Sequence, residues 1–175
     1  MATAKKTSAK STAKTPMTAR AAASDATILL ARDHAQVKKL FKQYEKLAGG
    51  QADSQERGEL AQQICQALTV HATVEEEIFY PAAREAGVKS DLLDEAEVEH
   101  ASAKDLIAQI EGMDPDEDLY DAKVKVLGEY IDHHVQEEEN EMFPKCRKAG
   151  MDLAALATEM AGRKQEINES EAVES

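Results

Sequence analysis

Residues 71–81 read HATVEEEIFYP, and residues 134–144 read HVQEEENEMFP. Each stretch begins with a histidine, has a glutamate four residues later and places a proline ten residues after the histidine. Residues four apart lie on one face of a helix, so each stretch predicts a helix that points one imidazole and one carboxylate in the same direction. The duplication predicts two copies of one structural unit, related by a pseudo-twofold axis.

The segment before each stretch also carries a histidine within an apolar stripe. His34 lies between Leu30 and Val37, and His100 fills a gap between Ala96 and Ala103. A period of about 3.6 residues places the members of each stripe on the inward face of a helix. Four helices are therefore expected to carry polar side chains at positions that normally hold apolar ones.

Caps and stop signals divide the rest of the chain. They predict four long helices, which run from Asp25 to Ala48, from Asp53 to Gly87, from Ser90 or Asp91 to Gly112, and from Asp114 to Gly150. The second opens with the capping box of Asp53 and Glu56, and the fourth with Pro115 in its first turn. Asp152 opens a short fifth helix that we expect to reach about Lys164. Short connections predict an all-α, up-down-up-down four-helix bundle.

Charge separates the ends of the chain from its middle. The net charge is −13 over 175 residues, but residues 1–24 hold five basic residues and no acid, which leaves −18 on the remainder. We expect residues 1–24 to form a disordered basic tail; a transit peptide and an electrostatic tether to an anionic polymer stay open. Residues 25–150 form the predicted bundle, and residues 151–175 a short helix with an acidic tail. An acidic body of this kind excludes nucleic-acid binding by the folded domain.

Location follows from segments that the sequence lacks. No apolar run reaches the roughly 18 residues of a membrane span, and no secretory signal is evident, so we expect a cytoplasmic protein without a membrane anchor. The two cysteines, Cys65 and Cys146, form no spaced motif and should stay reduced.

The inward polar residues predict a site for two metal ions. The expected ligands are four imidazoles and two carboxylates: His34, His71, Glu75, His100, His134 and Glu138. Carboxylates bridge cations and imidazoles suit transition metals, so this mixture favours iron, with manganese and zinc as alternatives. The competing interpretation is a set of hydrogen-bonded core histidines. It is disfavoured because an unpaired buried carboxylate is costly, and the sequence offers no cationic partner at core positions.

Several other polar residues near these positions have simpler expected roles. His133 should point roughly 100° away from its neighbour His134. Glu97, spaced three residues from His100, is the one residue among them that stays open as an extra ligand. Tyr44 and Tyr130 read as stripe residues. A further set reads as solvated helix faces: Glu76, Glu77, Glu137, Glu139 and Glu141.

Over about residues 25–150 these motifs resemble the hemerythrin-like domains, also called HHE cation-binding domains. The resemblance implies a non-haem di-iron centre with an oxo- or hydroxo-type bridge, in which Glu75 and Glu138 also bridge the irons. It assigns His34 with His71 to one iron, and it assigns to the second iron the histidines of the other half: His100 and His134.

The chain departs from the oxygen-carrying hemerythrins at two places. Those proteins have a second histidine four residues after the third-helix histidine, where this chain has Lys104, and an aspartate five residues after the last histidine, where this chain has Glu138 at four. One iron therefore lacks a ligand unless Glu97 or water supplies it. We expect a protein that binds, senses or reacts with oxygen, peroxide or nitric oxide. A peroxide-degrading di-metal enzyme and an iron-responsive structural or regulatory module stay open, and no protein partner is predicted.

Overall fold

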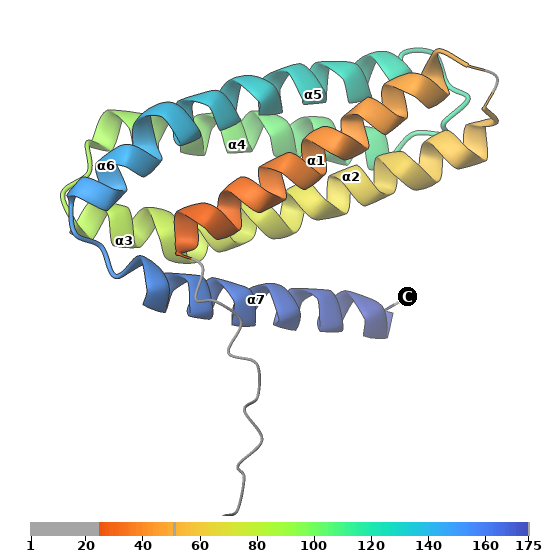
Figure 1. Ribbon diagram of the computed structural model, residues 1–175. Coiled ribbons are helices and arrows are strands. Elements are labelled where there is room, and N and C mark those ends of the chain that lie inside the picture. The colour runs from red at the N-terminus through yellow and green to blue at the C-terminus, as the bar shows by residue number, and fades with distance from the viewer. Residues whose placement is uncertain (1–24, 51, 175) are drawn as a thin grey trace, which may run out of the picture.

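All secondary structure in the described part of the chain is helical (Figure 1). The computed structural model describes residues 25–50 and 52–174, so the predicted basic tail, residues 1–24, lies outside it. The α-helices are α1 (Ala26–Ala48), α2 (Ser54–Val74), α3 (Tyr80–Glu85), α4 (Ser90–Glu111), α5 (Tyr120–Glu137), α6 (Phe143–Lys148) and α7 (Leu153–Glu174). Two π-helical turns join α2 to α3 and α5 to α6: η1 (Glu75–Phe79) and η2 (Glu138–Met142).

Four long helical rods form the expected antiparallel bundle (Figure 1). The first rod is α1, the second runs from α2 through η1 to α3, the third is α4, and the fourth runs from α5 through η2 to α6. Helix α1 packs against α2 and α5, and α4 packs against α5 and α2. The caps lie where the sequence places them: Asp25 accepts a hydrogen bond from the backbone N–H of Ile28, and Asp53 accepts one from Glu56. The prediction of an all-α, up-down-up-down bundle is confirmed.

The second and fourth rods each contain a π-helical turn that the sequence analysis did not predict. Each turn starts at the glutamate of the His-x-x-x-Glu motif and ends two residues before the proline. Pro81 and Pro144 have no N–H to donate to the preceding turn, and a proline ring clashes with the carbonyl four residues back. Widening that turn relieves the conflict, and the N–H of Tyr80 bonds to the carbonyl of Glu75. Such turns are frequent at functional sites.

The fourth rod starts later than predicted. Asp114, Pro115 and Glu117 make a separate turn, in which the N–H of Asp114 bonds to the Glu117 carboxylate. Helix α5 then begins at Tyr120, after Leu119 adopts a left-handed φ of 74°. Pro115 packs against Gly58 so closely that a Cβ at Gly58 would lie 2.6 Å from the proline ring. The turn docks on α2, and the chain must bend before the helix can run back along the bundle.

The fifth helix is not short. Helix α7 has 22 residues and reaches Glu174, so the predicted end near Lys164 and the frayed acidic end are wrong. The residues after Lys164 are mostly good helix formers, and neither glycine nor proline interrupts them. Among the described residues, no helix is both long enough and apolar enough to cross a bilayer.

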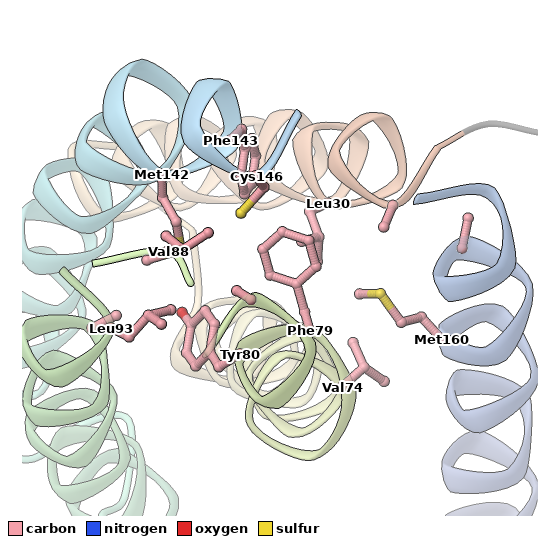
Figure 2. Packing of buried hydrophobic residues seen from close by; sticks show 14 residues of the cluster. Leu30, Val74, Phe79, Tyr80, Val88, Leu93, Met142, Phe143, Cys146 and Met160 are labelled. Carbon is pink, nitrogen blue, oxygen red and sulfur yellow. The ribbon is translucent and has the colours of Figure 1, made fainter. Parts of the chain in front are cut away.

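Two apolar clusters fill the bundle and leave a polar layer between them. The first lies at the α3–α6 end and contains Leu30, Phe79 and Phe143, with Met160 of α7 pointing into it (Figure 2). The second contains Val37, Leu68 and Ile107 and fills the other end. In each long rod the inward histidine falls between residues of the two clusters. The bundle therefore holds its buried polar groups at one level.

Candidate metal centre

The six polar residues that the sequence singles out converge in this layer. None is more than 6% exposed: His34, His71, Glu75, His100, His134 and Glu138. They come from all four rods, and both glutamates lie at the first residue of a π-helical turn. The structure therefore brings the whole expected set together.

The imidazoles meet in two pairs. Nε2 of His34 lies 3.1 Å from Nε2 of His71, and Nε2 of His100 lies 3.1 Å from Nε2 of His134. Two nitrogens that each lie about 2.0–2.1 Å from one tetrahedral metal ion are roughly 3.3 Å apart. Each pair thus has the separation of two ligands to one cation.

Each glutamate reaches both imidazole pairs. Oε2 of Glu75 lies 3.2 Å from Nε2 of His71 and 3.4 Å from Nε2 of His100. Oε2 of Glu138 lies 3.2 Å from Nε2 of His34 and 3.6 Å from Nε2 of His134. A carboxylate placed between two donor pairs is suited to bridging two cations.

Each imidazole is oriented from outside by a second carboxylate. The Nδ1 contacts are His34 with Glu139 at 2.9 Å, His71 with Asp33 at 3.1 Å, His100 with Glu76 at 2.9 Å and His134 with Glu99 at 2.7 Å. A histidine that donates its Nδ1–H to a carboxylate keeps a lone pair on Nε2, which is the arrangement found around metal-bound histidines. All four Nε2 atoms therefore face inward, where they could bind a metal ion.

The sequence analysis missed these outer carboxylates. It read Glu76 and Glu139 as solvated helix faces and gave no role to Asp33 or Glu99. The repeat held a signal, since Asp33 and Glu99 each precede a helix histidine, while Glu76 and Glu139 each follow a core glutamate. Each outer carboxylate contacts a histidine of another helix, so spacing within one helix does not reveal the pair.

In the described part of the chain, three of the four oxygens of the core carboxylates lack a hydrogen-bond donor. Within the described residues, both oxygens of Glu75 and Oε2 of Glu138 are buried without a hydrogen-bond donor, and imidazole nitrogens lie 3.2 to 3.6 Å from the two Oε2 atoms. No described lysine or arginine contacts either group. A buried charge needs a partner, and lone pairs on imidazole and carboxylate converge where a cation would supply one. These residues fit a pair of metal ions.

Protonation of the imidazoles reflects the same excess of negative charge. Burial opposes a charge on His71, but Glu75 and Asp33 outweigh it and raise the pKa of His71 to about 10. The pKa of His134 rises to about 8, because Glu138 and its neighbours likewise outweigh burial. The pKa of Glu75 lies well below its usual range, since the adjacent imidazoles overcome the effect of burial. In metal-free protein, protons on His71 and His134 therefore offset part of this negative charge.

One hydroxyl makes the two halves of the centre different. Oη of Tyr80 lies 3.4 Å from Nε2 of His100. The matching residue before the second proline is Phe143, whose ring stacks on His34 with centroids 5.9 Å apart. One imidazole pair therefore has a polar neighbour and the other an apolar one.

The remaining candidates lie outside the centre. Glu97, which the sequence left open as an extra ligand, bonds to Arg84 on the surface. Lys104 bonds to the outer carboxylate Glu76 at 2.6 and 2.7 Å. His133 is exposed, 3.7 Å from Glu99, and Tyr130 is exposed as well. The other stripe tyrosine, Tyr44, is buried but directs its hydroxyl to Asp121.

A small enclosed cavity adjoins the imidazoles. Its volume is about 20 Å³, and its lining combines the four histidines with aliphatic side chains that include Val37, Leu68, Ala103 and Ile107. About 10–15 Å³ is enough for one water molecule. The space is therefore large enough for a water-sized ligand.

The fold and this site define a helical cation-binding domain, and sequence comparison identifies its family. Residues 25–146 match the Hemerythrin HHE cation binding domain, so the chain belongs to that family. A crystal structure of a hemerythrin HHE cation binding domain-containing protein from Mycobacterium kansasii is similar, with a TM-score of 0.69 and 25% identity over 84% of this chain and 89% of that one.

A curated relative is much longer. A DNA nickase from Nostoc sp. is 30% identical over 142 residues, which cover 78% of this chain and 38% of the relative. The chain thus spans well under half the length of that protein. The expected resemblance to HHE domains is confirmed, and the domain is a cation-binding one.

Proposed function

We propose that the six core residues hold two iron ions, with Glu75 and Glu138 as bridges and an oxo- or hydroxo-type bridge between the metals. The observation that carries this proposal is the convergence of four inward Nε2 atoms on two buried carboxylates, three of whose four oxygens lack a donor among the described residues. Manganese and zinc share much of this ligand chemistry and are the alternatives.

Local charge supports two ions rather than one. The centre contains six carboxylates, two in the core and four outside, and two lysines contact the outer ones: Lys104 and Lys164. With neutral imidazoles, the six carboxylates and two lysines have a net charge of −4. Two divalent cations would neutralise it. A single divalent ion would leave the buried layer with two uncompensated charges, which is costly in a low-dielectric interior.

We further propose that the centre binds, senses or reacts with a small oxidant such as oxygen, peroxide or nitric oxide. Bound iron would supply an exchangeable position and electrons. The protein orients each imidazole through an outer carboxylate, and aliphatic side chains such as Leu68 line part of the adjoining cavity. The cavity volume of about 20 Å³ favours a ligand of a few atoms.

The direct test is optical. Anaerobic protein loaded with ferrous iron is exposed in turn to air, peroxide and nitric oxide, with His71→Ala as the control. We expect a new near-ultraviolet to visible band in the wild type and a weaker one or none in the variant. A wild-type spectrum that none of the three oxidants changes would reject oxidant reactivity.

Two alternatives have support in particular features. The set formed by Glu75, His100 and His134 has one donor fewer than the other, and this favours a peroxide-degrading enzyme with an open position. Sustained loss of peroxide with wild type but not with His71→Ala would establish turnover. The buried Glu75 carboxylate, which has no donor among the described residues, favours an iron-responsive structural module, because metal binding would contribute folding energy. For that module a chelator must lower the thermal midpoint sharply.

Nickase activity is not part of this proposal. The name DNA nickase belongs to a relative, and the match with this chain covers only 38% of that relative's length. Residues 25–175 carry a net charge of −18, which repels the phosphate backbone, so we propose that the folded domain does not bind nucleic acid.

A further inference from the structure

Helix α7 lies outside the matched family domain, which ends at residue 146. It runs along α1 and α2 on the outside of the four-helix bundle (Figure 1) and also contacts η1, the turn that begins with Glu75. Met160 of α7 is fully buried in the first apolar cluster (Figure 2). The added helix is therefore packed against the rods that carry His34 and His71.

One side chain of α7 reaches the outer shell of the metal centre. Nζ of Lys164 donates to Oδ2 of Asp33, and the same oxygen lies 3.1 Å from Nδ1 of His71. The side chains of Lys164 and Asp33 are only 18% and 23% exposed. The chain of contacts from α7 to a core imidazole is thus short and largely shielded from water.

The other three outer carboxylates pair with a more exposed cationic side chain, or with no lysine or arginine among the described residues. Glu76 pairs with Lys104, whose side chain is 47% exposed, and Glu99 lies near the exposed His133. For Glu139, the described residues include no lysine or arginine within ion-pair distance. Shielded pairs are less screened by solvent than exposed ones, so Lys164 has the strongest hold on its carboxylate.

We propose that Lys164 is a positioning residue for the metal centre: by fixing Asp33, it holds His71 with Nε2 toward the metal. This inference rests on the proposed function. Without the ammonium group, Asp33 is free to turn toward solvent, and the imidazole loses the partner that sets its orientation. Changes to such partners typically reduce metal affinity about 10–100-fold.

The chain offers a matched control on the same helix. Arg163 pairs with Glu77 at 2.7 and 3.2 Å, so it also ties α7 to the second rod. In the described part of the chain, the Glu77 carboxylate pairs with Arg163 and makes no hydrogen bond or ion pair with a core residue. Arg163→Met therefore weakens the docking of α7 but leaves the outer carboxylates with their partners. Lys164→Met weakens the docking and also removes the lysine partner of Asp33. Lys164→Arg retains the charge.

The first measurement is an anaerobic competition titration with ferrous iron and a chromophoric chelator. We expect Lys164→Met to bind one of the two ions, the one assigned to His34 and His71, about tenfold less tightly or worse. Arg163→Met should bind both ions as the wild type does, even if its thermal midpoint falls as far as that of Lys164→Met. Lys164→Arg should recover most of the affinity. Equal affinities for Lys164→Met and wild type, or an equal loss in Arg163→Met, would overturn the inference.

The second measurement needs no metal. Ring-nitrogen NMR of the metal-free protein should show a protected Nδ1–H signal for His71 in wild type and Arg163→Met, and its loss in Lys164→Met. A retained signal in Lys164→Met would reject the role of Lys164. Failure of the wild type to bind iron would instead reject the proposed function, and the NMR comparison would still decide whether Lys164 positions His71.

Discussion

The hydroxyl of Tyr80 donates a hydrogen bond of 2.9 Å to Oε1 of Glu138. The other core carboxylate, Glu75, has no such donor among the described residues. Because the two halves of the chain are related by an internal repeat, this bond marks the main departure from symmetry at the centre. The Glu138 carboxylate is held in place before any metal arrives, while Glu75 depends on the imidazoles and the metal.

Tyr80→Phe should therefore destabilise the metal-free protein more than the loaded one. Loss of a hydrogen bond to a buried charged group costs about 1.5–3 kcal/mol, and a bound metal would offset part of this by taking the freed oxygen. Denaturant unfolding with and without metal measures the difference. Tyr44→Phe, which removes a hydroxyl from Asp121 far from the centre, should lose the same amount in both forms. Equal losses for Tyr80→Phe in the two forms would contradict this view of Glu138.

The outer carboxylates can be tested on one helix. Glu99 bonds to Nδ1 of His134, whereas Glu97, two residues earlier, bonds only to Arg84 on the surface. Glu99→Gln should lower metal affinity about 10–100-fold, because the amide is a weaker acceptor and no longer fixes the imidazole. Glu97→Gln should have no effect. Competition titration gives both numbers, and identical affinities for the two variants would show that the outer shell does not matter.

Metal-free protein should lose stability as pH rises. The pKa of His71 is about 10 and that of His134 about 8 in the folded state, against about 6.5 in the unfolded state. A raised folded-state pKa stabilises the fold fully below about pH 6.5, and that stability is lost as pH rises through the folded-state values. Thermal midpoints of chelator-treated protein should therefore fall between pH 6.5 and 10.

Metal-loaded protein should behave differently over the same range. Protons and metal ions compete for the same Nε2 atoms, so metal affinity rises with pH and offsets the loss. A metal-free midpoint that stays constant from pH 6.5 to 10 would show that neither imidazole is held protonated by the core carboxylates.

The cavity beside the imidazoles predicts how ligand size is selected. Leu68→Ala enlarges this cavity, whereas Leu127→Ala removes an equally buried side chain from the same apolar cluster without lining it. Each variant should cost about 2–5 kcal/mol in unfolding free energy. Only Leu68→Ala should speed the binding of azide to the iron-loaded protein, as stopped-flow absorbance would record. Faster binding in both variants would mean that general loosening, not the cavity, controls access.

Much of the core site could be predicted from sequence because the helix period alone fixes it. His71 and Glu75 share one face of one helix, and the repeat doubles that face. The outer shell was missed because each of its contacts joins residues far apart in sequence, as Asp33 and His71 do. The late start of α5 was missed because it depends on how Pro115 packs against Gly58. Local signals carry no information on such contacts.

The length of α7 was underestimated for a related reason. Its sequence after Lys164 is acidic and has no sharp apolar stripe, so it reads as a frayed end. Helix α7 packs on α1 and α2, where Met160 is buried and Lys164 bonds to Asp33. The sequence of α7 alone does not reveal this packing.

Stoichiometry tests the central claim most directly. Metal-free protein is titrated anaerobically with ferrous iron, and bound metal per chain is measured after desalting, beside a double variant with Glu75→Gln and Glu138→Gln. The account predicts two ions per wild-type chain and loss of both in the variant, because the bridging carboxylates supply the charge that each ion needs. A wild-type chain that retains one ion or none, or a double variant that still binds two, would contradict it.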